Sequence, residues 1–364
     1  MIGQPLWLDG LGHPVAVGDG LLHRVGELVQ QWAPSHRYAV ITDSTVAPLY
    51  AGAVKASFDQ AAAVDLFTFP AGERHKTRET WTVLTDELLT TGFGRDSSIV
   101  ALGGGVVGDL AGFVAATFMR GIPVVQVPTT LVAMVDSAIG GKTAVDVPAG
   151  KNLVGAFHLP AGVLVDPQVL ATLALREFQA GLAEVLKHGA IADHSYFSEV
   201  AGALPGLLSV DHGGGGTLRQ IIARSIAIKI RIAGADIGEA GIRKVLNFGH
   251  TVGHAVELAS GFSLLHGEAI SIGMVAEAAA GELAGITEAG TTDAIRSALR
   301  AAGLPVELPG GVTGAAVMQA AATDKKRQAG VLEFSLPRRI GEMARVGDGW
   351  TVPLSEDVLL EVLR

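Results

Sequence analysis

A short apolar run that leads directly into a glycine-rich turn is the feature that most constrains the fold of this chain. Residues 98–102, Ser-Ile-Val-Ala-Leu, are mostly apolar and partly β-branched, as in a buried strand, and Gly103-Gly-Gly105-Val-Val-Gly108 follows them at once. Glycines in the spacing G-x-G-x-x-G let backbone N–H groups approach a pyrophosphate at the N-terminus of a helix. The segment therefore predicts a strand, a turn and a helix that either bind a dinucleotide or make a tight structural connection.

Strand-like and helix-like segments alternate through the first half of the chain, and helical patterns dominate beyond Asp166. Alternation of this kind is typical of a parallel sheet covered by helices. We therefore predict an α/β fold, with an N-terminal Rossmann-like parallel-sheet domain over residues 1–170 and a mainly α-helical domain over residues 171–364. The expected strands are 38–43, 98–102, 123–127 and 163–165; the expected helices are 80–89, 176–191, 218–234, 248–260, 268–284 and 293–302; residues 210–217 are expected to form a loop.

Composition excludes several classes of protein. The formal net charge is −9 and the chain has no Lys/Arg-rich run, which argues against a nucleic-acid partner. There is no Cys, so any metal must bind to His and carboxylate side chains. The most apolar stretch, residues 97–119, contains many Gly residues and Asp109, which fits a buried strand and helix better than a membrane span. The N-terminus has no basic start and apolar core, so we expect a cytoplasmic protein without a membrane partner.

The glycine-rich turn lacks one usual companion, an acidic residue about 20 positions later. Asp43, at the end of an earlier expected strand, is a better candidate to bind a ribose. A helix N-cap is an equally good interpretation of Asp43 from sequence.

A second glycine motif, Gly140-Gly-Lys142-Thr143, superficially suggests a phosphate-binding Walker loop. No Gly stands at the position where that motif requires its first Gly, so we reject an NTPase. Lys142 and the nearby Lys151-Asn152 are expected to form a compact set of donors for phosphate or carboxylate. The alternative is a solvated basic loop.

A set of His and Glu residues predicts a metal site in the helical half. Glu184 and Lys187 are three apart, and His250 and His254 are four apart, so each pair shares one helix face. His266 follows after a short loop. One Glu with two or three His suits an open zinc site with positions left for substrate oxygens. Spacing alone makes His250 and His254 the candidate metal ligands. It leaves open whether His254 binds the metal or supports another residue that does.

Arg243 and Asn247, four apart, could hold a carboxylate or phosphate near this metal helix. Lys325 and Lys326 could do the same or form a solvated surface run. A nucleotide turn, a metal site and cationic side chains together suggest a metal that polarises a secondary alcohol while NAD accepts a hydride. The residues alone therefore indicate a metal-dependent alcohol dehydrogenase.

The chain also resembles the dehydroquinate synthases, a family of sugar-phosphate cyclases, from about Asp43 to Phe334. The segments that carry the resemblance are Pro70-Ala-Gly-Glu73-Arg-His-Lys76, Ala101-Leu-Gly-Gly-Gly-Val-Val-Gly-Asp109-Leu-Ala-Gly-Phe113, Val127-Pro-Thr-Thr-Leu131, Asp136-Ser-Ala-Ile-Gly-Gly-Lys142-Thr-Ala-Val-Asp146, Gly150-Lys-Asn152-Leu-Val-Gly-Ala-Phe157, Ala183-Glu184-Val-Leu-Lys187-His188-Gly189, Leu246-Asn-Phe-Gly-His250-Thr-Val-Gly-His254-Ala255 and His266-Gly-Glu268-Ala269. Thr45, Ala138 and Ile237 depart from residues that are frequent in the family, and none of the three is an expected ligand.

The resemblance implies a role for each matching residue. Metal ligands would be Glu184, His250 and His266, which makes His254 a substrate-side or proton-relay residue. The NAD site would contain Asp43, Glu73, Lys76, Gly103, Gly104, Gly105, Asp109, Thr129, Thr130, Lys142 and Lys151. Substrate would be held by Asp136, Lys142, Lys151, Asn152, Lys187, Arg243, Asn247, His254 and Lys326, with the choice between Lys325 and Lys326 open. Arg120 would reach the phosphate in a neighbouring subunit, which implies a homodimer.

The activity implied is conversion of 3-deoxy-D-arabino-heptulosonate 7-phosphate to 3-dehydroquinate and phosphate. In the family's reaction NAD oxidises the C5 hydroxyl, phosphate leaves, NADH returns the hydride, and the ring opens and recloses by an aldol step. Zinc is the expected metal and cobalt the alternative. Other cyclases of the superfamily, which make an amino-dehydroquinate, a 2-epi-5-epi-valiolone or a 2-deoxy-scyllo-inosose, are the nearest rivals. A glycerol-dehydrogenase-like enzyme and a non-enzymatic binding protein are more distant ones.

Overall fold

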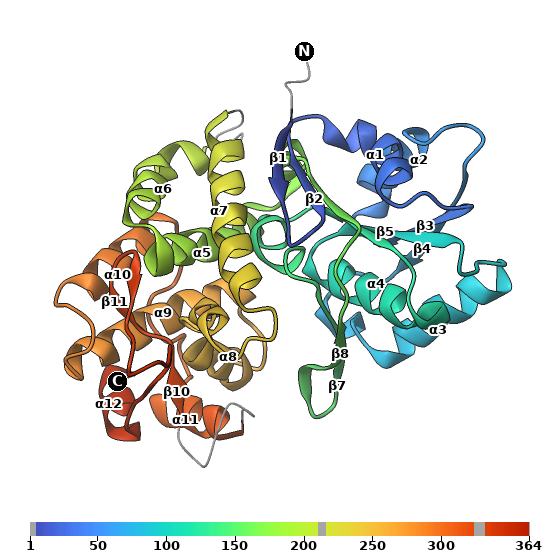
Figure 1. The fold of residues 1–364 in the computed structure, drawn as a ribbon. Coiled ribbons are helices and arrows are strands. Elements are labelled where there is room, and N and C mark those ends of the chain that lie inside the picture. Colours follow the sequence, from blue (N-terminus) through green and yellow to red (C-terminus); the bar gives the residue numbers. More distant parts are fainter. Residues whose placement is uncertain (1–4, 210–215, 324–331, 364) are drawn as a thin grey trace. The chain divides into compact units, whose positions relative to one another are not determined.

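The computed structural model describes residues 5–209, 216–323 and 332–363 (Figure 1). The chain forms two compact units. The first comprises residues 1–173 and 214–230, and the second comprises residues 174–213 and 231–364.

A seven-stranded sheet organises the first unit. The edge strand β1 runs antiparallel to β2, and every other neighbouring pair is parallel. In sheet order the strands are β1 (Leu6–Asp9), β2 (Pro14–Val17), β9 (Gly162–Val165), β6 (Val124–Pro128), β5 (Ser97–Gly103), β3 (Arg37–Asp43) and β4 (Ala63–Phe69). The predicted Rossmann-like parallel sheet is thus confirmed.

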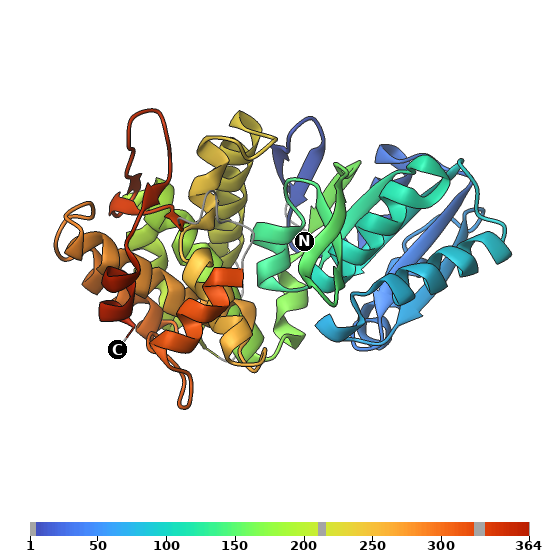
Figure 2. The same ribbon diagram turned by 90° about the horizontal axis from the view of Figure 1, so that it is seen from below.

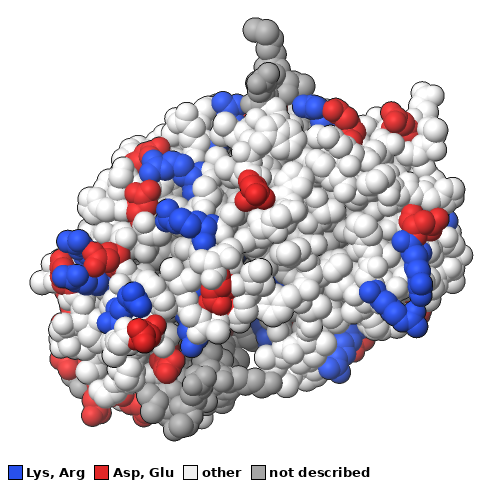
Figure 3. All heavy atoms as spheres, viewed as in Figure 1, with Lys and Arg blue, Asp and Glu red and all other residues white. Residues whose placement is uncertain are grey.

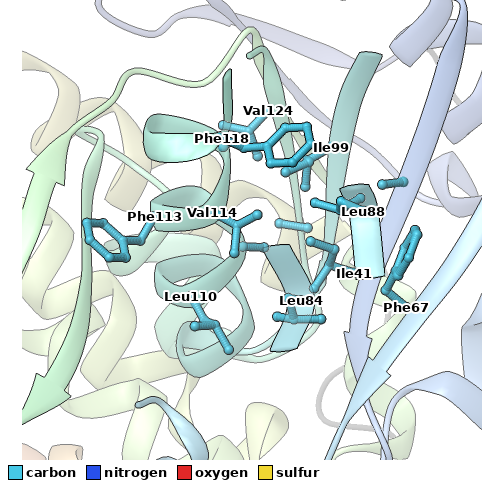
Figure 4. Packing of buried hydrophobic residues seen from close by; sticks show 14 of the residues in the cluster. Ile41, Phe67, Leu84, Leu88, Ile99, Leu110, Phe113, Val114, Phe118 and Val124 are labelled. Atoms are coloured by element: carbon cyan, nitrogen blue, oxygen red, sulfur yellow. The ribbon is translucent and has the colours of Figure 1, made fainter. Parts of the chain in front are cut away.

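Four α-helices, α1 (Val25–Trp32), α2 (Gly52–Ala56), α3 (Arg78–Thr90) and α4 (Gly105–Thr117), accompany the sheet. Helix α4 follows β5 and packs its apolar side chains against the sheet and α3, as the close view in Figure 4 shows. Leu110 and Val114, one turn apart on α4, lie in the same buried cluster as Ile99 and Leu84. This packing fixes the turn between β5 and α4 from both sides.

Residues 142–157 form a separate two-stranded antiparallel hairpin of β7 (Lys142–Val147) and β8 (Gly150–Phe157). Strand β7 packs on α4. The sequence did not indicate this hairpin, β4 or the β1–β2 hairpin.

Helix α7 (Gly216–Ala235) begins in the first unit, to which residues up to Ile230 belong. Two ion pairs bind this part of the helix to the first unit: Arg219 Nη1 lies 3.1 Å from Asp19 Oδ2, and Lys229 Nζ lies 2.5 Å from Asp136 Oδ1. An apolar helical pattern alone could not reveal these two attachments.

The second unit is mainly helical, as predicted. Its helices α8 and α9 pack against each other, and α5 and α11 pack on this pair (Figures 1 and 2). The helices are α5 (Leu175–Ala192), α6 (His194–Leu207), α8 (His250–Ala259), α9 (His266–Leu283), α10 (Thr291–Ala301), α11 (Gly314–Thr323) and α12 (Glu356–Val362); the strands β10 (Glu333–Phe334), β11 (Pro337–Arg339), β12 (Glu342–Met343) and β13 (Val352–Pro353) form two short antiparallel pairs.

Surface charges are mixed on the face drawn in Figure 3, where Lys and Arg side chains lie beside Asp and Glu side chains. Arg339 of β11 pairs with Glu342 of β12 at 2.8 Å. Within the described ranges, no helix has the length and apolarity needed to cross a membrane.

Candidate nucleotide and metal sites

The carboxyl ends of three neighbouring parallel strands bring the expected nucleotide-binding residues to one edge of the sheet. Strand β3 ends at Asp43, β5 at Gly103, and β6 leads into Thr129 and Thr130. The backbone N–H of Thr129 donates to the carbonyl of Gly103 at 2.9 Å, so the last two segments are in direct contact. Ligands of open α/β sheets bind outside this edge.

The turn between β5 and α4 has no room for side chains. A Cβ on Gly103 would overlap Val107, and one on Gly104 would lie 3.0 Å from Thr130 Cγ2. Gly104 precedes the first turn of α4 and provides no side-chain cap. N–H groups at such a helix end suit a pyrophosphate, so the residues present fit a dinucleotide.

Asp43 caps the turn that follows β3. Its Oδ1 accepts the backbone N–H groups of Thr45 at 2.8 Å and Val46 at 2.9 Å. The N-cap position of the helical segment that follows, Ala47–Ala51, is Val46, so Asp43 caps the preceding turn and not that segment. A ribose contact through the other carboxylate oxygen stays a prediction.

Lys76 is the centre of a buried charge cluster. Its side chain is 4% exposed, and its Nζ lies 2.8 Å from Glu73 Oε1, 3.2 Å from Asp109 Oδ2 and 3.7 Å from Asp146 Oδ1. It also donates to Asn152 Oδ1 at 2.8 Å. The structure thus brings together three expected NAD-site residues and one expected substrate residue, although they come from three separate segments.

The cluster changes the protonation of its members. Burial alone would lower the pKa of Lys76, but Asp109, Glu73 and Asp146 together raise it well above its usual value. Burial raises the pKa of Asp109 to about 6, against the opposing effect of Lys76. One lysine therefore faces three carboxylates, and Asp109 takes up a proton as the pH falls toward about 6.

The prediction that Lys142, Lys151 and Asn152 form a compact set is wrong. These residues lie on a hairpin, where Lys142 pairs with Phe157 at one end and Val147 pairs with Gly150 at the other. A strand rises about 3.3 Å per residue, so several residues of extended chain separate Lys142 from Lys151. Asn152 is held at the turn end, where its N–H donates to Asp146 Oδ1 at 2.9 Å.

Asp136 has a partner that sequence reasoning missed. Lys229 of α7 is buried, and its Nζ lies 2.5 Å from both the Oδ1 and the carbonyl oxygen of Asp136. Lys229 sits between Ile228 and Ile230 and belongs to no recognisable motif. The contact adds a buried ammonium group beside an expected substrate residue.

The expected metal ligands converge within the second unit. Glu184 of α5 is fully buried, and its Oε1 lies 3.6 Å from Nε2 of His250 and 3.5 Å from Nε2 of His266. One donor atom from each residue lies within 4.8 Å of the others. Lys187, one turn along α5, forms an ion pair with the second oxygen of Glu184. A carboxylate with two imidazoles suits Zn²⁺ or Co²⁺, so these residues fit the expected metal.

Glu257 of α8 is a further member that the sequence did not reveal. It is buried, and its Oε1 lies 3.4 Å from Nδ1 of His266. Burial would lower the pKa of His266, but Glu184 and Glu257 outweigh this effect and raise it to about 10. A carboxylate on one ring nitrogen leaves the other to face a metal, as metal-binding histidines require.

His254 lies beside these rings. Its ring centroid is 5.3 Å from that of His250 and 5.9 Å from that of His266. The structure therefore places the three His together: Glu184 groups with His250 and His266, and His254 groups with Glu257 and His266.

Arg243 and Asn247 lie in a short 3-10 helix, Ile242–Asn247, whose start is bound by Asp236. The carboxylate of Asp236 accepts the N–H groups of Gly241 at 2.7 Å and Arg243 at 3.1 Å. Asn247 donates from Nδ2 to Glu239 Oε1 at 2.8 Å, a contact the sequence did not indicate. Both expected substrate residues are therefore held by a short, hydrogen-bonded segment before α8.

Glu268, Arg120 and Lys326 also belong to segments that the sequence singled out. Glu268 is a helix-capping residue, because it accepts the N–H of Leu265 at 2.8 Å and two donors of Arg176 at 2.7 Å. Arg120 follows α4 in the left-handed region at φ 70° and is exposed. Lys326 and its neighbour Lys325 lie outside the described residues.

Comparison with known proteins adds independent findings. Residues 66–180 match the family model of the 3-dehydroquinate synthase N-terminal part, and residues 181–327 match that of the C-terminal part. The 3-dehydroquinate synthase of Symbiobacterium thermophilum is 45% identical over 339 residues, which cover 92% of this chain and 94% of that protein.

Two solved structures have the same fold over nearly the whole chain. One is a 2-deoxy-scyllo-inosose synthase complexed with carbaglucose-6-phosphate, NAD⁺ and Co²⁺, with a TM-score of 0.89, 28% identity and 99% coverage of each chain. The other is the 2-epi-5-epi-valiolone synthase of Streptomyces hygroscopicus subsp. jinggangensis 5008 with NAD⁺ and Zn²⁺ bound, with a TM-score of 0.87, 28% identity and coverage of 98% and 97%.

Proposed function

The chain belongs to the 3-dehydroquinate synthase family, and from this premise we propose that it converts 3-deoxy-D-arabino-heptulosonate 7-phosphate to 3-dehydroquinate and phosphate. The reaction makes it a phosphate-eliminating lyase of the shikimate pathway, which leads to chorismate and the aromatic amino acids. The observation that carries the proposal is the convergence of Glu184, His250 and His266 on one point.

We propose NAD and a divalent ion, Zn²⁺ or Co²⁺, as cofactors. Glu184, His250 and His266 would hold the ion, and the β5–α4 turn with the Lys76 cluster would hold NAD. When bound, NAD supplies a hydride acceptor and the ion a Lewis acid. The solved cyclases that contain NAD⁺ with Co²⁺ or Zn²⁺ support this assignment.

The chain's own side chains would bind and orient the substrate. Cationic and amide groups suit its carboxylate, its phosphate and its hydroxyls. Holding them in one geometry favours elimination and ring closure over side reactions. His254, next to the metal-facing imidazoles, would hold or move a proton on the substrate side. The proposed substrate residues are Asp136, Lys142, Lys151, Asn152, Lys187, Arg243, Asn247, His254 and Lys326.

We also propose a homodimer in the cytoplasm, in which Arg120 serves the phosphate of the neighbouring subunit. Exposure of Arg120 and its left-handed backbone support a role outside its own core, because this conformation is uncommon for a residue other than Gly.

A substrate panel tests the proposed activity against the related cyclases. Purified protein with NAD and Zn²⁺ is given 3-deoxy-D-arabino-heptulosonate 7-phosphate, sedoheptulose 7-phosphate or glucose 6-phosphate, and the product is identified by mass. We expect 3-dehydroquinate from the first substrate only. Turnover of sedoheptulose 7-phosphate or glucose 6-phosphate instead would assign the chain to a valiolone or inosose synthase activity.

A further inference from the structure

Helices α8 and α9 each provide one expected metal ligand, and they pack at very short range. A Cβ on Gly273 of α9 would overlap the carbonyl oxygen of Gly249, and one on Gly249 would lie 2.5 Å from Met274 Cγ. Gly249 has a left-handed φ of 80° and directly precedes His250, the first residue of α8. Glycines on both sides therefore allow the backbone of α8 to begin against the middle of α9.

A fully buried carboxylate meets this helix start. Glu277 of α9 accepts the N–H of Gly249 through Oε2 at 2.7 Å and the N–H of Val252 through Oε1 at 2.9 Å. The two donors are backbone groups on either side of His250. A buried carboxylate is costly unless it is hydrogen-bonded, and the N-terminus of a helix is a favourable place for it.

We infer that Glu277 is a positioning residue that sets where His250 stands relative to His266 and thereby determines metal affinity. The inference rests on the proposed metal site and concerns a residue outside the ligand set. Glu277 and His266 are parts of one rigid helix, α9. Because the carboxylate holds the two N–H groups that flank His250, it transmits the position of α9 to that imidazole. The Nε2 atoms of both His rings then meet the same oxygen of Glu184.

Glu282 provides a matched control on the same helix. Its Oε1 accepts the N–H of Thr292 at 2.7 Å and so caps the start of α10. Helix α10 carries none of the proposed ligands. Glu282→Gln therefore removes the same charge from a capping side chain of α9 without touching the start of α8.

The experiment compares Co²⁺ and Zn²⁺ binding to metal-free wild type, Glu277→Gln and Glu282→Gln. Co²⁺ affinity and geometry are measured from its visible absorption bands, Zn²⁺ affinity by competition with a chelator, and folding by circular dichroism. We expect Glu277→Gln to raise the Kd about tenfold or more and to change the Co²⁺ spectrum, since residues that support metal ligands have effects of this size. Excess metal should restore part of its activity. Glu282→Gln should keep the wild-type Kd and spectrum.

If Glu277→Gln folds and keeps the wild-type Kd and Co²⁺ spectrum, the inference is overturned and the proposed metal site is unaffected. Wild type that binds no metal would overturn both. If Glu277→Gln does not fold, Glu277→Asp decides: it keeps the charge but shortens the reach. A raised Kd in that variant supports the positioning role, and an unchanged Kd overturns it.

Discussion

The Oε1 atom of Glu184 lies 3.5 Å from the Nε2 atom of His266, although α5 and α9 are far apart in the sequence. The contact depends on how closely the start of α9 approaches α5. Gly267 makes that approach possible, because a Cβ at this position would overlap the carbonyl oxygen of Ala180. The distance between the two expected ligands is therefore determined by a glycine next to one of them.

Gly267→Ala should move the start of α9 away from α5. We expect a loss of about 1–3 kcal/mol in the free energy of unfolding from overpacking, together with weaker metal binding. Denaturant unfolding and a Zn²⁺ titration measure the two effects. Gly202→Ala is the control: Gly202 lies in α6 with open space around its Cα, so Ala should stabilise the protein by about 0.5–1 kcal/mol. Equal behaviour of the two variants would refute this explanation.

Lys76→Met should leave Glu73, Asp109 and Asp146 facing one another without the ammonium group that lies between them. Breaking a buried ion pair of this kind costs about 3–5 kcal/mol of stability. Because the pKa of Asp109 is raised to about 6, the folded state binds more protons than the unfolded state between the pKa of an unfolded Asp and about pH 6. The contribution of Asp109 to the free energy of unfolding therefore falls as the pH rises through this range. Without Lys76 the pKa of Asp109 rises further, and the pH range over which its deprotonation weakens the fold extends upward.

The loss of stability in Lys76→Met should therefore be larger at pH 8 than at pH 5.5, and NAD binding should be weakened at both. Urea unfolding at the two pH values and an NAD titration check these expectations. Lys55→Met, at an exposed position of α2, should change neither quantity. A loss that is equal at both pH values would show that the carboxylates do not repel one another as described.

Buried His13 should make the stability of the fold sensitive to acid. The residue is 6% exposed, its ring nitrogens have no hydrogen-bond partner among the described residues, and burial lowers its pKa to about 4. The unfolded chain binds a proton near pH 6.5 and the folded protein does not. Stability should therefore fall as pH drops from about 6.5 to about 4, by at most about 3 kcal/mol from this residue.

His13→Leu should remove that part of the pH dependence, whereas His23→Leu, at an exposed position, should keep it. Free energies of unfolding at pH 7 and pH 5 provide the comparison. If wild type and His13→Leu lose the same stability between these pH values, the histidine does not stay neutral in the fold.

The proposed exchange of Arg120 between subunits predicts complementation. Arg120→Ala and Lys187→Met should each abolish turnover, because one lacks the donated arginine and the other a substrate residue. Subunits mixed by unfolding and refolding should regain about a quarter of wild-type activity, since half of the dimers are mixed and each has one intact site. Recovery of no activity, with dimers present by light scattering, would contradict the exchange.

The parts of the fold that were predicted correctly have strong local signals. Residues 98–102 lie within β5 and the glycine motif opens α4, because an apolar run followed by glycines has few alternatives. The long helices were placed within two residues of their bounds by apolar periodicity, α9 for example at Glu268–Ala284 against His266–Leu283. Helix α6 was missed, and it contains Gly202, Pro205 and Gly206.

The site was predicted only as far as residue types and family resemblance extend. Glu184, His250 and His266 do come together, as the resemblance implied. Their supports were not predicted: Glu257 and Glu277 look like ordinary helix residues until α8 and α9 pack. The expected compact set of Lys142 and Lys151 is not formed, because the two lysines stand toward opposite ends of a hairpin that the sequence did not indicate. Contacts between segments that are distant in the sequence cannot be predicted from local sequence patterns.

Phosphate release from 3-deoxy-D-arabino-heptulosonate 7-phosphate, measured after chelation and after return of Zn²⁺, tests the central claim most directly. Wild type with NAD should lose turnover on chelation and regain it with Zn²⁺, with 3-dehydroquinate formed in step with phosphate. Glu184→Gln should stay inactive in both conditions, while Glu177→Gln, on the exposed side of α5, should follow wild type. Phosphate release that survives chelation, or that persists in Glu184→Gln, would contradict the account.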